Sequence, residues 1–199
     1  AALAGALRGH LDAAGEDPDR APARALVPVN LRPGPPAPGE ELGNRFGLVF
    51  LDLPVDAATP AARLAAVRSR MAEAKERPDA LATFGVLALL GRLPALAPWV
   101  TGFFSRKASL VVTNVPGPRE PLHLGGRRVD DAMFWVPHPA ALGLGVSLLT
   151  YAGAVRMGVR ADAAVMDDPA DLVRRFEAEL LPESPRRRPP QATGRRRRA

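Results

Sequence analysis

The segment that most constrains the fold of this chain is 113–118, Thr-Asn-Val-Pro-Gly-Pro, which places two prolines and a glycine directly after a short apolar run. Proline fixes φ and lacks an N–H donor, so it ends strand pairing, and glycine allows the backbone conformations of tight turns. We therefore expect a buried strand over residues 108–112 that leads into a rigid loop at 113–118.

Three helices are predicted from apolar spacing and from end signals. A leucine at every fourth position predicts a helix over residues 2–14. Thr59-Pro60 and Asp168-Pro169 each begin a further helix, because a capping side chain followed by proline is typical of a helix start. The apolar stripes expected to face the core are Leu64, Val67, Met71 and Ala74 in the second helix, and Leu172, Val173, Phe176 and Leu180 in the last.

The strands are predicted from shorter patterns. Alternation with a period of two predicts a strand over 23–31, and the run 46–51 is apolar on both faces, which is typical of a central strand covered from either side. A tight turn is expected at Ala152-Gly153. Together these elements predict an α/β (α+β) fold, a mixed β-sheet with flanking helices. Further strands are expected at 127–136, 142–150 and 154–160.

The basic charge of the chain is concentrated at its C-terminal end. Seven of the 27 Lys and Arg residues lie within 186–198, and the remaining basic residues are nearly balanced by the 21 acidic ones. The folded part therefore lacks the basic excess of a nucleic-acid-binding domain. We expect one domain over residues 1–182 and a disordered Arg/Pro-rich tail over 183–199. The chain has no cysteine, which excludes disulfides and Cys-ligated metals.

The segment 81–104 carries a single charge, Arg92, over a length that could cross a bilayer. Pro94 and Pro98 interrupt a continuous helix. Two interpretations stay open, namely two short core helices or a surface-lying apolar element that reaches lipid. We expect a cytoplasmic protein, with this element as the candidate for peripheral attachment to a membrane or lipid droplet. The start at Ala1, without a signal peptide, is typical of a truncated or fragmentary chain.

Residue chemistry alone identifies no catalytic centre and no metal site. Ser147 lacks the second glycine of a GxSxG elbow. Gly143 and Gly145 lack the third glycine of a dinucleotide fingerprint, so we interpret them as strand positions where another backbone comes close. The three histidines are outside any metal-ligand or catalytic spacing and are interpreted as surface or loop residues; they are His10, His123 and His138.

Within 113–118, two residues are the best candidates for a functional contact. Asn114 offers a donor and an acceptor at a strand end, and Gly117 permits close backbone approach. The alternative that Asn114 only caps the turn stays open.

The order and spacing of several short motifs resemble the C-terminal half of the bacterial wax ester synthase/diacylglycerol acyltransferase family, over nearly all of residues 1–182. The resemblance implies the second lobe of a CoA-dependent, chloramphenicol acetyltransferase-like acyltransferase fold. The motifs are 113–118, Pro121-Leu122, 124–126 (Leu-Gly-Gly), 135–137 (Trp-Val-Pro), 142–147 (Leu-Gly-Leu-Gly-Val-Ser) and Tyr151.

The resemblance also implies which residues border the substrate channel and what is missing. The family's first half carries an HHxxxDG motif with the catalytic histidine, and this motif is absent here, so the chain alone is predicted to be inactive. Implied channel-lining or structural residues are Thr113, Asn114, Pro116, Gly117 and Pro118, and implied family-signature residues are Asn44, Arg45, Gly143, Gly145 and Ser147.

The intact enzyme is implied to transfer a fatty acyl group from acyl-CoA, as substrate and without a cofactor, to diacylglycerol or a long-chain alcohol. Its implied partners are the lipid acceptor and an N-terminal lobe carrying HHxxxDG. Two alternatives stay open. One is a non-catalytic lipid- or membrane-associating module acting through 81–104, and the other is nucleic-acid binding by the arginine tail.

Overall fold

A five-stranded mixed sheet of order β2-β1-β3-β6-β7 forms the centre of the molecule. The computed structural model describes residues 1–31, 46–76, 85, 102, 105–137 and 142–180, and all structural statements concern these residues. The helices are α1 (Ala2–Ala13), α2 (Pro60–Glu76) and α5 (Pro169–Leu180). The sheet strands are β1 (Ala23–Asn30), β2 (Phe46–Leu53), β3 (Leu110–Pro116), β6 (Leu144–Tyr151) and β7 (Ala154–Ala161), and a separate ribbon consists of β4 (His123–Leu124) and β5 (Arg127–Arg128).

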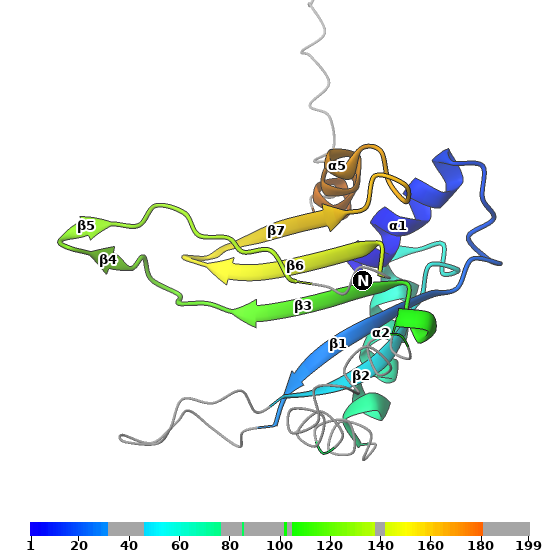
Figure 1. The fold of residues 1–199 in the computed structure, drawn as a ribbon, viewed down its shortest axis with the longest axis horizontal. Helices are drawn as coiled ribbons and strands as arrows, with labels where there is room; N and C mark the ends of the chain where they lie inside the picture. Colours follow the sequence, from blue (N-terminus) through cyan, green and yellow to red (C-terminus); the bar gives the residue numbers. More distant parts are fainter. Residues whose placement is uncertain (32–45, 77–84, 86–101, 103–104, 138–141, 181–199) are drawn as a thin grey trace, which may run out of the picture.

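Strand direction determines where the functional motifs meet. β1, β3 and β6 run parallel to one another, whereas β2 and β7 pair antiparallel at the two edges (Figure 1). The carboxyl ends of β3 and β6 therefore lie side by side at one end of the sheet.

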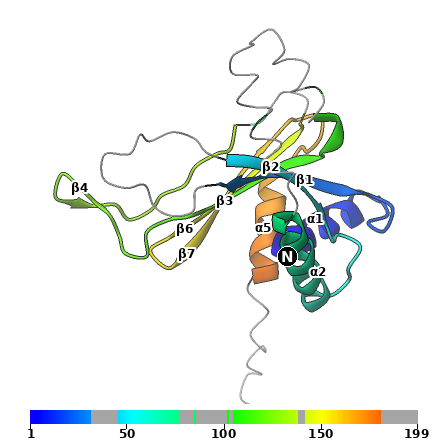
Figure 2. The same cartoon turned by 90° about the horizontal axis from the view of Figure 1, so that it is seen from below.

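The main core lies between the sheet and the helices α1, α2 and α5, which share one face of the sheet (Figure 2). Every second strand residue points to this face, as the period of a strand requires. The buried core side chains include Ala25, Leu51, Leu110, Val146, Leu3, Leu7, Leu172 and Phe176.

The opposite face of the sheet carries a smaller apolar cluster, formed by Leu26, Val111, Val136 and Leu142. Val136 belongs to the irregular segment 129–137 and packs against the sheet. The prediction of a strand over 127–136 was wrong beyond Arg127–Arg128, because residues 129–137 join no ladder of the sheet and Val136 packs on its face instead.

β2 lies at the edge of the sheet, so its prediction as a central strand was wrong. Both of its faces nevertheless pack against apolar residues: Val49 and Leu51 are buried on the helix side, and Leu48 and Phe50 pack against the smaller cluster. A strand with apolar residues on both faces is covered on both faces of the sheet, but this pattern does not indicate the position of the strand within the sheet.

β3 extends to Pro116, so the loop predicted from residue 113 begins only after residue 116. Thr113 to Pro116 pair in parallel register with β6. The proline is tolerated because it is the last residue of the strand, where a missing donor disturbs only the end of the ladder. The predicted tight turn is confirmed, since Ala152 and Gly153 have φ of 47° and 81°.

The predicted helix starts are confirmed by cap hydrogen bonds. The Ala62 N–H donates to Thr59 Oγ1 at 3.2 Å, and the Ala170 N–H donates to Asp168 Oδ1 at 3.0 Å. The inward stripes were partly wrong, because Leu64 is 42% exposed and Leu180 is 47% exposed.

Arg63, the neighbour of Leu64, occupies the inward face of α2 instead. Its Nη1 donates to the carbonyls of Ala57 and Ala58, both at 3.0 Å, and its Nη2 donates to the Glu179 carboxylate of α5 at 2.5 and 2.6 Å.

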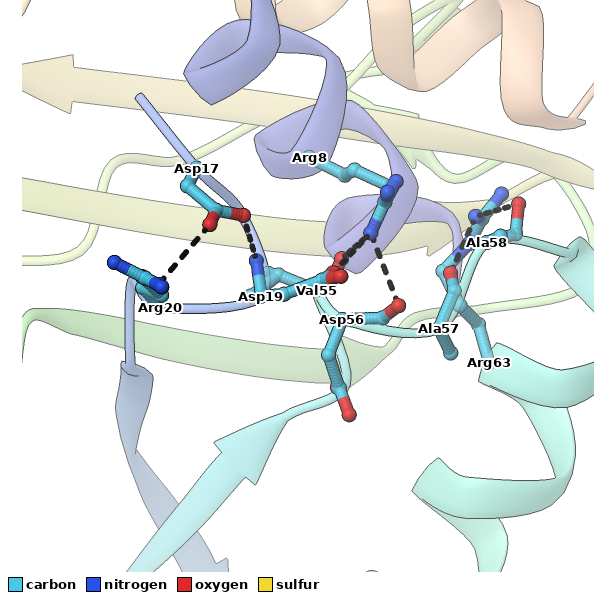
Figure 3. Close-up of polar contacts among 9 residues, drawn as sticks. All are labelled: Arg8, Asp17, Asp19, Arg20, Val55, Asp56, Ala57, Ala58 and Arg63. Carbon is cyan, nitrogen blue, oxygen red and sulfur yellow. Dashed lines mark hydrogen bonds and ion pairs between the residues drawn. The ribbon is translucent and has the colours of Figure 1, made fainter.

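Arg8 of α1 binds the same β2–α2 connection as Arg63. Its Nη1 donates to the carbonyls of Val55 and Asp56 at 2.8 and 3.0 Å (Figure 3). Two arginines thus fix the β2–α2 connection to α1 and α5.

Candidate functional site

The candidate site lies at the carboxyl ends of β3 and β6. The parallel register pairs Thr113 with Ser147 and Asn114 with Leu148, so two motifs separated in the sequence become neighbouring strands. Paired residues of neighbouring strands share a face. The structure thereby brings together 113–118 and the strand that begins after Gly143.

Asn114 is exposed on the helix-bearing face of the sheet. It lies two residues after Val112, which pairs with Val146 and packs against the main core on the same face. Its carboxamide makes no hydrogen bond within the described part of the chain. Asn114 lies inside a strand, so turn capping is not its role here. Its amide donor and its carbonyl acceptor are both available to another molecule.

Gly117 and Pro118 are fixed against the β6–β7 hairpin. The Gly117 N–H donates to the Thr150 carbonyl at 2.9 Å, and the Ala152 N–H donates to the Pro118 carbonyl at 2.9 Å. A Cβ on Gly117 would overlap the Thr150 carbonyl oxygen, so the close backbone approach predicted for this glycine is confirmed.

Ser147 is fully buried and has a structural role. Its hydroxyl contacts the carbonyl oxygens of Phe134 and Gly158. A Cβ on Gly158 would lie 2.5 Å from Ser147 Oγ, so this glycine makes room for the serine. The contact with Phe134 ties the segment 129–137 to the sheet. Thr113 is half-buried beside Ser147 on the same face.

Gly143 directly precedes β6, and Gly145 is the second residue of this strand. The Gly143 carbonyl accepts a hydrogen bond from the Asp162 N–H at 2.8 Å, and a Cβ on Gly143 would overlap the Val165 side chain. Gly143 is thus approached by the Asp162 backbone at its carbonyl and by the Val165 side chain at the place where a Cβ would sit. Gly145 is buried and pairs with Val111 of β3.

Other predicted residues are not brought to this site. His10 lies in α1, and His123 is exposed in β4. Among the described side chains, no group of His, Cys, Asp and Glu could hold a metal ion. Predictions for Asn44, Arg45, His138, the tail and nearly all of 81–104 lie outside the described residues.

Two hollows of the described structure lie at the opposite end of the sheet. One hollow of about 430 Å³ is lined by Arg24 and Asp52, and an apolar cavity of about 220 Å³ is lined by Leu110 and Leu144, at the amino ends of β3 and β6. In the first hollow, Arg24 Nε donates to Asp52 at 2.6 Å, and this hydrogen bond holds the pKa of the Asp52 carboxyl below its usual value. None of the residues 113–118 lines either hollow.

Tyr151 contributes contacts that the sequence did not predict, although it is the only tyrosine of the chain. Its buried hydroxyl accepts a hydrogen bond from the Leu122 N–H at 3.0 Å and donates to the Val129 carbonyl at 2.6 Å. The sequence shows a single tyrosine at the end of a strand, and nothing in it indicates that the hydroxyl binds residues 22 and 29 positions away.

Comparison with known proteins supplies the wider context. The probable diacylglycerol O-acyltransferases tgs1 and tgs2 of Mycobacterium tuberculosis are 35% and 34% identical to this chain over 196 and 164 residues, covering 94% and 80% of it. The match covers 42% of tgs1 and 36% of tgs2, so the chain spans only about two fifths of the length of these relatives.

A solved structure shares the fold. The wax ester synthase/diacylglycerol acyltransferase of Marinobacter aquaeolei VT8 superposes with a TM-score of 0.62 at 24% identity, over 90% of this chain and 40% of that one. No helix within the described ranges combines the length and apolarity needed to cross a bilayer. Residues 42–181 match the model of the WS/DGAT C-terminal domain, and this chain therefore belongs to the wax ester synthase/diacylglycerol acyltransferase family.

Proposed function

We propose that this chain is the C-terminal half of an O-acyltransferase that transfers a fatty acyl group from acyl-CoA to diacylglycerol or a long-chain alcohol. The observation that carries this proposal is the family match over residues 42–181, together with relatives named as diacylglycerol O-acyltransferases. The HHxxxDG motif is absent from this sequence, so the catalytic histidine would come from an N-terminal domain.

Acyl transfer needs a base for the alcohol proton, donors for the developing oxyanion and a channel that excludes water. The described site offers no base for the alcohol proton, but it offers a rigid wall for the substrate channel. We assign Thr113, Asn114, Pro116, Gly117 and Pro118 to this wall, because β6 and the turn after it fix their backbone and the Asn114 amide has no hydrogen-bond partner among the described residues. Asn114 would orient the substrate through its amide donor and acceptor.

We further propose that the folded domain ends near residue 182 and that the protein attaches peripherally to lipid. The family match ends at residue 181 and α5 ends at Leu180, which supports the domain boundary. The lipid acceptors reside in membranes or droplets, which supports peripheral attachment. Flotation with lipid vesicles, with and without residues 81–104, would test the attachment.

The test of the half-enzyme is CoA release from palmitoyl-CoA, with dioleoylglycerol or hexadecanol as acceptor. The assay compares this chain alone, the N-terminal part of tgs1 that lies outside the match alone, and the two co-expressed. We expect turnover only in the third case. Turnover by this chain alone, or none with both halves present, would contradict the proposal.

The role of Asn114 is tested in the same assay. Asn114→Ala should lower kcat about tenfold or more, because a lost substrate hydrogen bond of this kind is worth about 1.4 kcal/mol or more. Glu177→Ala, an exposed substitution on α5, serves as the control and should leave kcat unchanged. If both variants retain wild-type kcat, Asn114 has no part in the site, although the half-enzyme proposal would stand.

A further inference from the structure

The apolar cavity at the amino ends of β3 and β6, which lie beside α1 in Figure 1, reaches into the main core. Its volume is about 220 Å³. The deepest lining side chains are buried members of the main core, namely Leu7, Leu110, Leu144 and Met166. A close-packed protein interior leaves few voids larger than a water molecule, so a cavity of this size has room for another molecule.

Hydrogen bonds hold two walls of the cavity in place. On one side, Ser109 Oγ donates to the Pro22 carbonyl at 3.2 Å. On the other side, the Val165 and Met166 N–H groups donate to the Asp162 carbonyl at 2.9 and 3.0 Å. Walls that are fixed in this way do not collapse into the space, so the cavity is formed before a ligand enters it, as is usual for small-molecule sites.

Val165 forms the rim of the cavity, because its side chain lines the cavity and is 58% exposed. Its Cγ2 lies 2.4 Å from the place that a Cβ on Gly143 would take. A larger residue at 143 would therefore push Val165 away from the rim. The glycine that precedes β6 thus shapes the mouth of the cavity.

The size and the lining of the cavity fit an unbranched alkyl chain. An apolar cavity of about 150 Å³ stays dry and binds benzene, which has about six carbon atoms' worth of volume. By proportion, the cavity of about 220 Å³ holds about nine carbon atoms. Burial of an apolar chain among leucine and methionine side chains is favourable because it removes apolar surface from water.

His10 of α1 is a polar side chain available at the mouth of the cavity. Its imidazole lines the cavity and makes no hydrogen bond within the described residues. The Ser109 hydroxyl lines the cavity as well, but it already donates to the Pro22 carbonyl. An imidazole can donate to or accept from a hydroxyl group, so an alcohol is a head group that His10 can hold.

The surroundings of the mouth disfavour an anionic head group. The arginines of the neighbouring hollow are engaged, since Arg24 binds the Asp52 carboxylate at 2.6 Å and Arg70 donates to the Asp52 carbonyl at 2.8 Å. A second hollow shares His10 with the cavity and is lined by three carboxylates, those of Asp167, Asp168 and Asp171. A carboxylate or phosphate at the mouth would therefore meet negative charge without a cation to pair with it.

We propose that this cavity binds the alkyl chain of a neutral lipid alcohol, with the chain between α1 and the amino ends of β3 and β6 and the hydroxyl at His10. The site goes beyond the proposed function, because it lies at the opposite end of the sheet from Asn114. It is a second lipid site, separate from the candidate acyl-transfer site, and it needs no residue of the N-terminal part of the family.

The test is calorimetric titration of the full chain with nonanol and with nonanoate, each below the concentration at which it aggregates. Nonanol has the chain length that matches the cavity, and nonanoate differs from it only in the charged head group. We expect saturable binding of nonanol and binding of nonanoate that is weaker by about tenfold or more. Asp167→Lys, at an exposed position, should strengthen nonanoate binding about threefold or more and leave nonanol binding within about twofold.

Two further variants test the chain and the hydroxyl separately. Leu11→Trp adds bulk at a half-buried lining position and should weaken nonanol binding about tenfold or more. The matched control Leu64→Trp changes an exposed leucine of α2 outside the cavity and should bind within about twofold of wild type. His10→Ala should weaken nonanol binding about threefold or more, the effect of one lost hydrogen bond. Thermal unfolding followed by circular dichroism shows that each variant is folded.

Several outcomes would overturn the proposal. These are no saturable binding of nonanol, unchanged binding by folded Leu11→Trp or His10→Ala, a loss of the same size in Leu64→Trp, and nonanoate binding as tight as that of nonanol. Tighter binding of nonylamine than of nonanol would assign the mouth to a cation and would also overturn it. Nonanol binding without acyl transfer by the mixed halves would leave this site standing and refute the proposed function alone.

Discussion

Glu179→Ala tests the most buried ion pair of the described residues. The Arg63 side chain is 3% exposed, and its Nη2 has no partner in the described structure other than the Glu179 carboxylate. Its Nε has no hydrogen-bond partner among the described residues, and its Nη1 keeps only the backbone carbonyls of Ala57 and Ala58. Removing the carboxylate therefore leaves a buried guanidinium without its counter-charge.

The expected cost follows from the burial of the two partners. Breaking a buried pair by removing one side costs about 3–5 kcal/mol, whereas an exposed pair is worth about 0–1 kcal/mol. The Glu179 side chain is 22% exposed, so water can enter the space left by its truncation. We therefore expect the free energy of unfolding to fall by about 3 kcal/mol, the lower end of the buried range.

Urea unfolding measures this change as a lower midpoint at constant m-value. Asp131→Asn, which breaks the exposed pair with Arg156, is the control and should cost less than about 1 kcal/mol. Arg63→Met/Glu179→Met should regain most of the loss, because a buried pair can be replaced by apolar side chains at little cost. A loss for Glu179→Ala no larger than that of the control would refute the reasoning.

Three further predictions rest on close contacts and on charge. Alanine at Gly158 places a Cβ 2.5 Å from Ser147 Oγ, so denaturant unfolding should report a loss of about 1–3 kcal/mol; wild-type stability would contradict the packing described. Alanine at Gly117 meets a backbone carbonyl that cannot rotate away, so its thermal midpoint should fall by several degrees, as about 1–3 kcal/mol implies. The hydrogen bond from Arg24 lowers the pKa of Asp52, so this pair stabilises the fold above about pH 4 and the contribution is lost as the pH falls through the lowered pKa. Asp52→Asn should cost up to about 1 kcal/mol at pH 7 and progressively less as the pH falls through the lowered pKa, measured by urea unfolding over a pH series.

Local signals predicted the helix starts and one turn correctly. Thr59 and Asp168 cap their helices through their own side chains, and Ala152-Gly153 turns because both residues adopt positive φ. Each of these features depends on neighbours within a few positions, so the sequence contains all of the information needed.

Features that depend on distant partners could not be predicted in this way. The apolar stripe of α2 was placed on Leu64, but the inward position belongs to Arg63, whose partner Glu179 lies 116 residues away. In the same way, β2 was placed at the centre of the sheet because the pairing of β1 with β3 leaves no local trace. Periodicity identifies which side chains are apolar, and long-range pairing decides which of them are covered.

The sequence predicted the location of the site but not the extent of its strand, because that extent depends on a distant partner strand. The 113–118 motif was identified from its prolines and glycine, but its strand extends to Pro116 because β6 supplies a parallel partner. The carboxyl ends of β3 and β6 form an exposed edge, and the described pockets lie at the other end of the sheet. A substrate at this edge would be enclosed only if a second surface faced Asn114. The missing HHxxxDG motif calls for the same second surface, so the catalytic half of the family is the partner that we expect to complete the site.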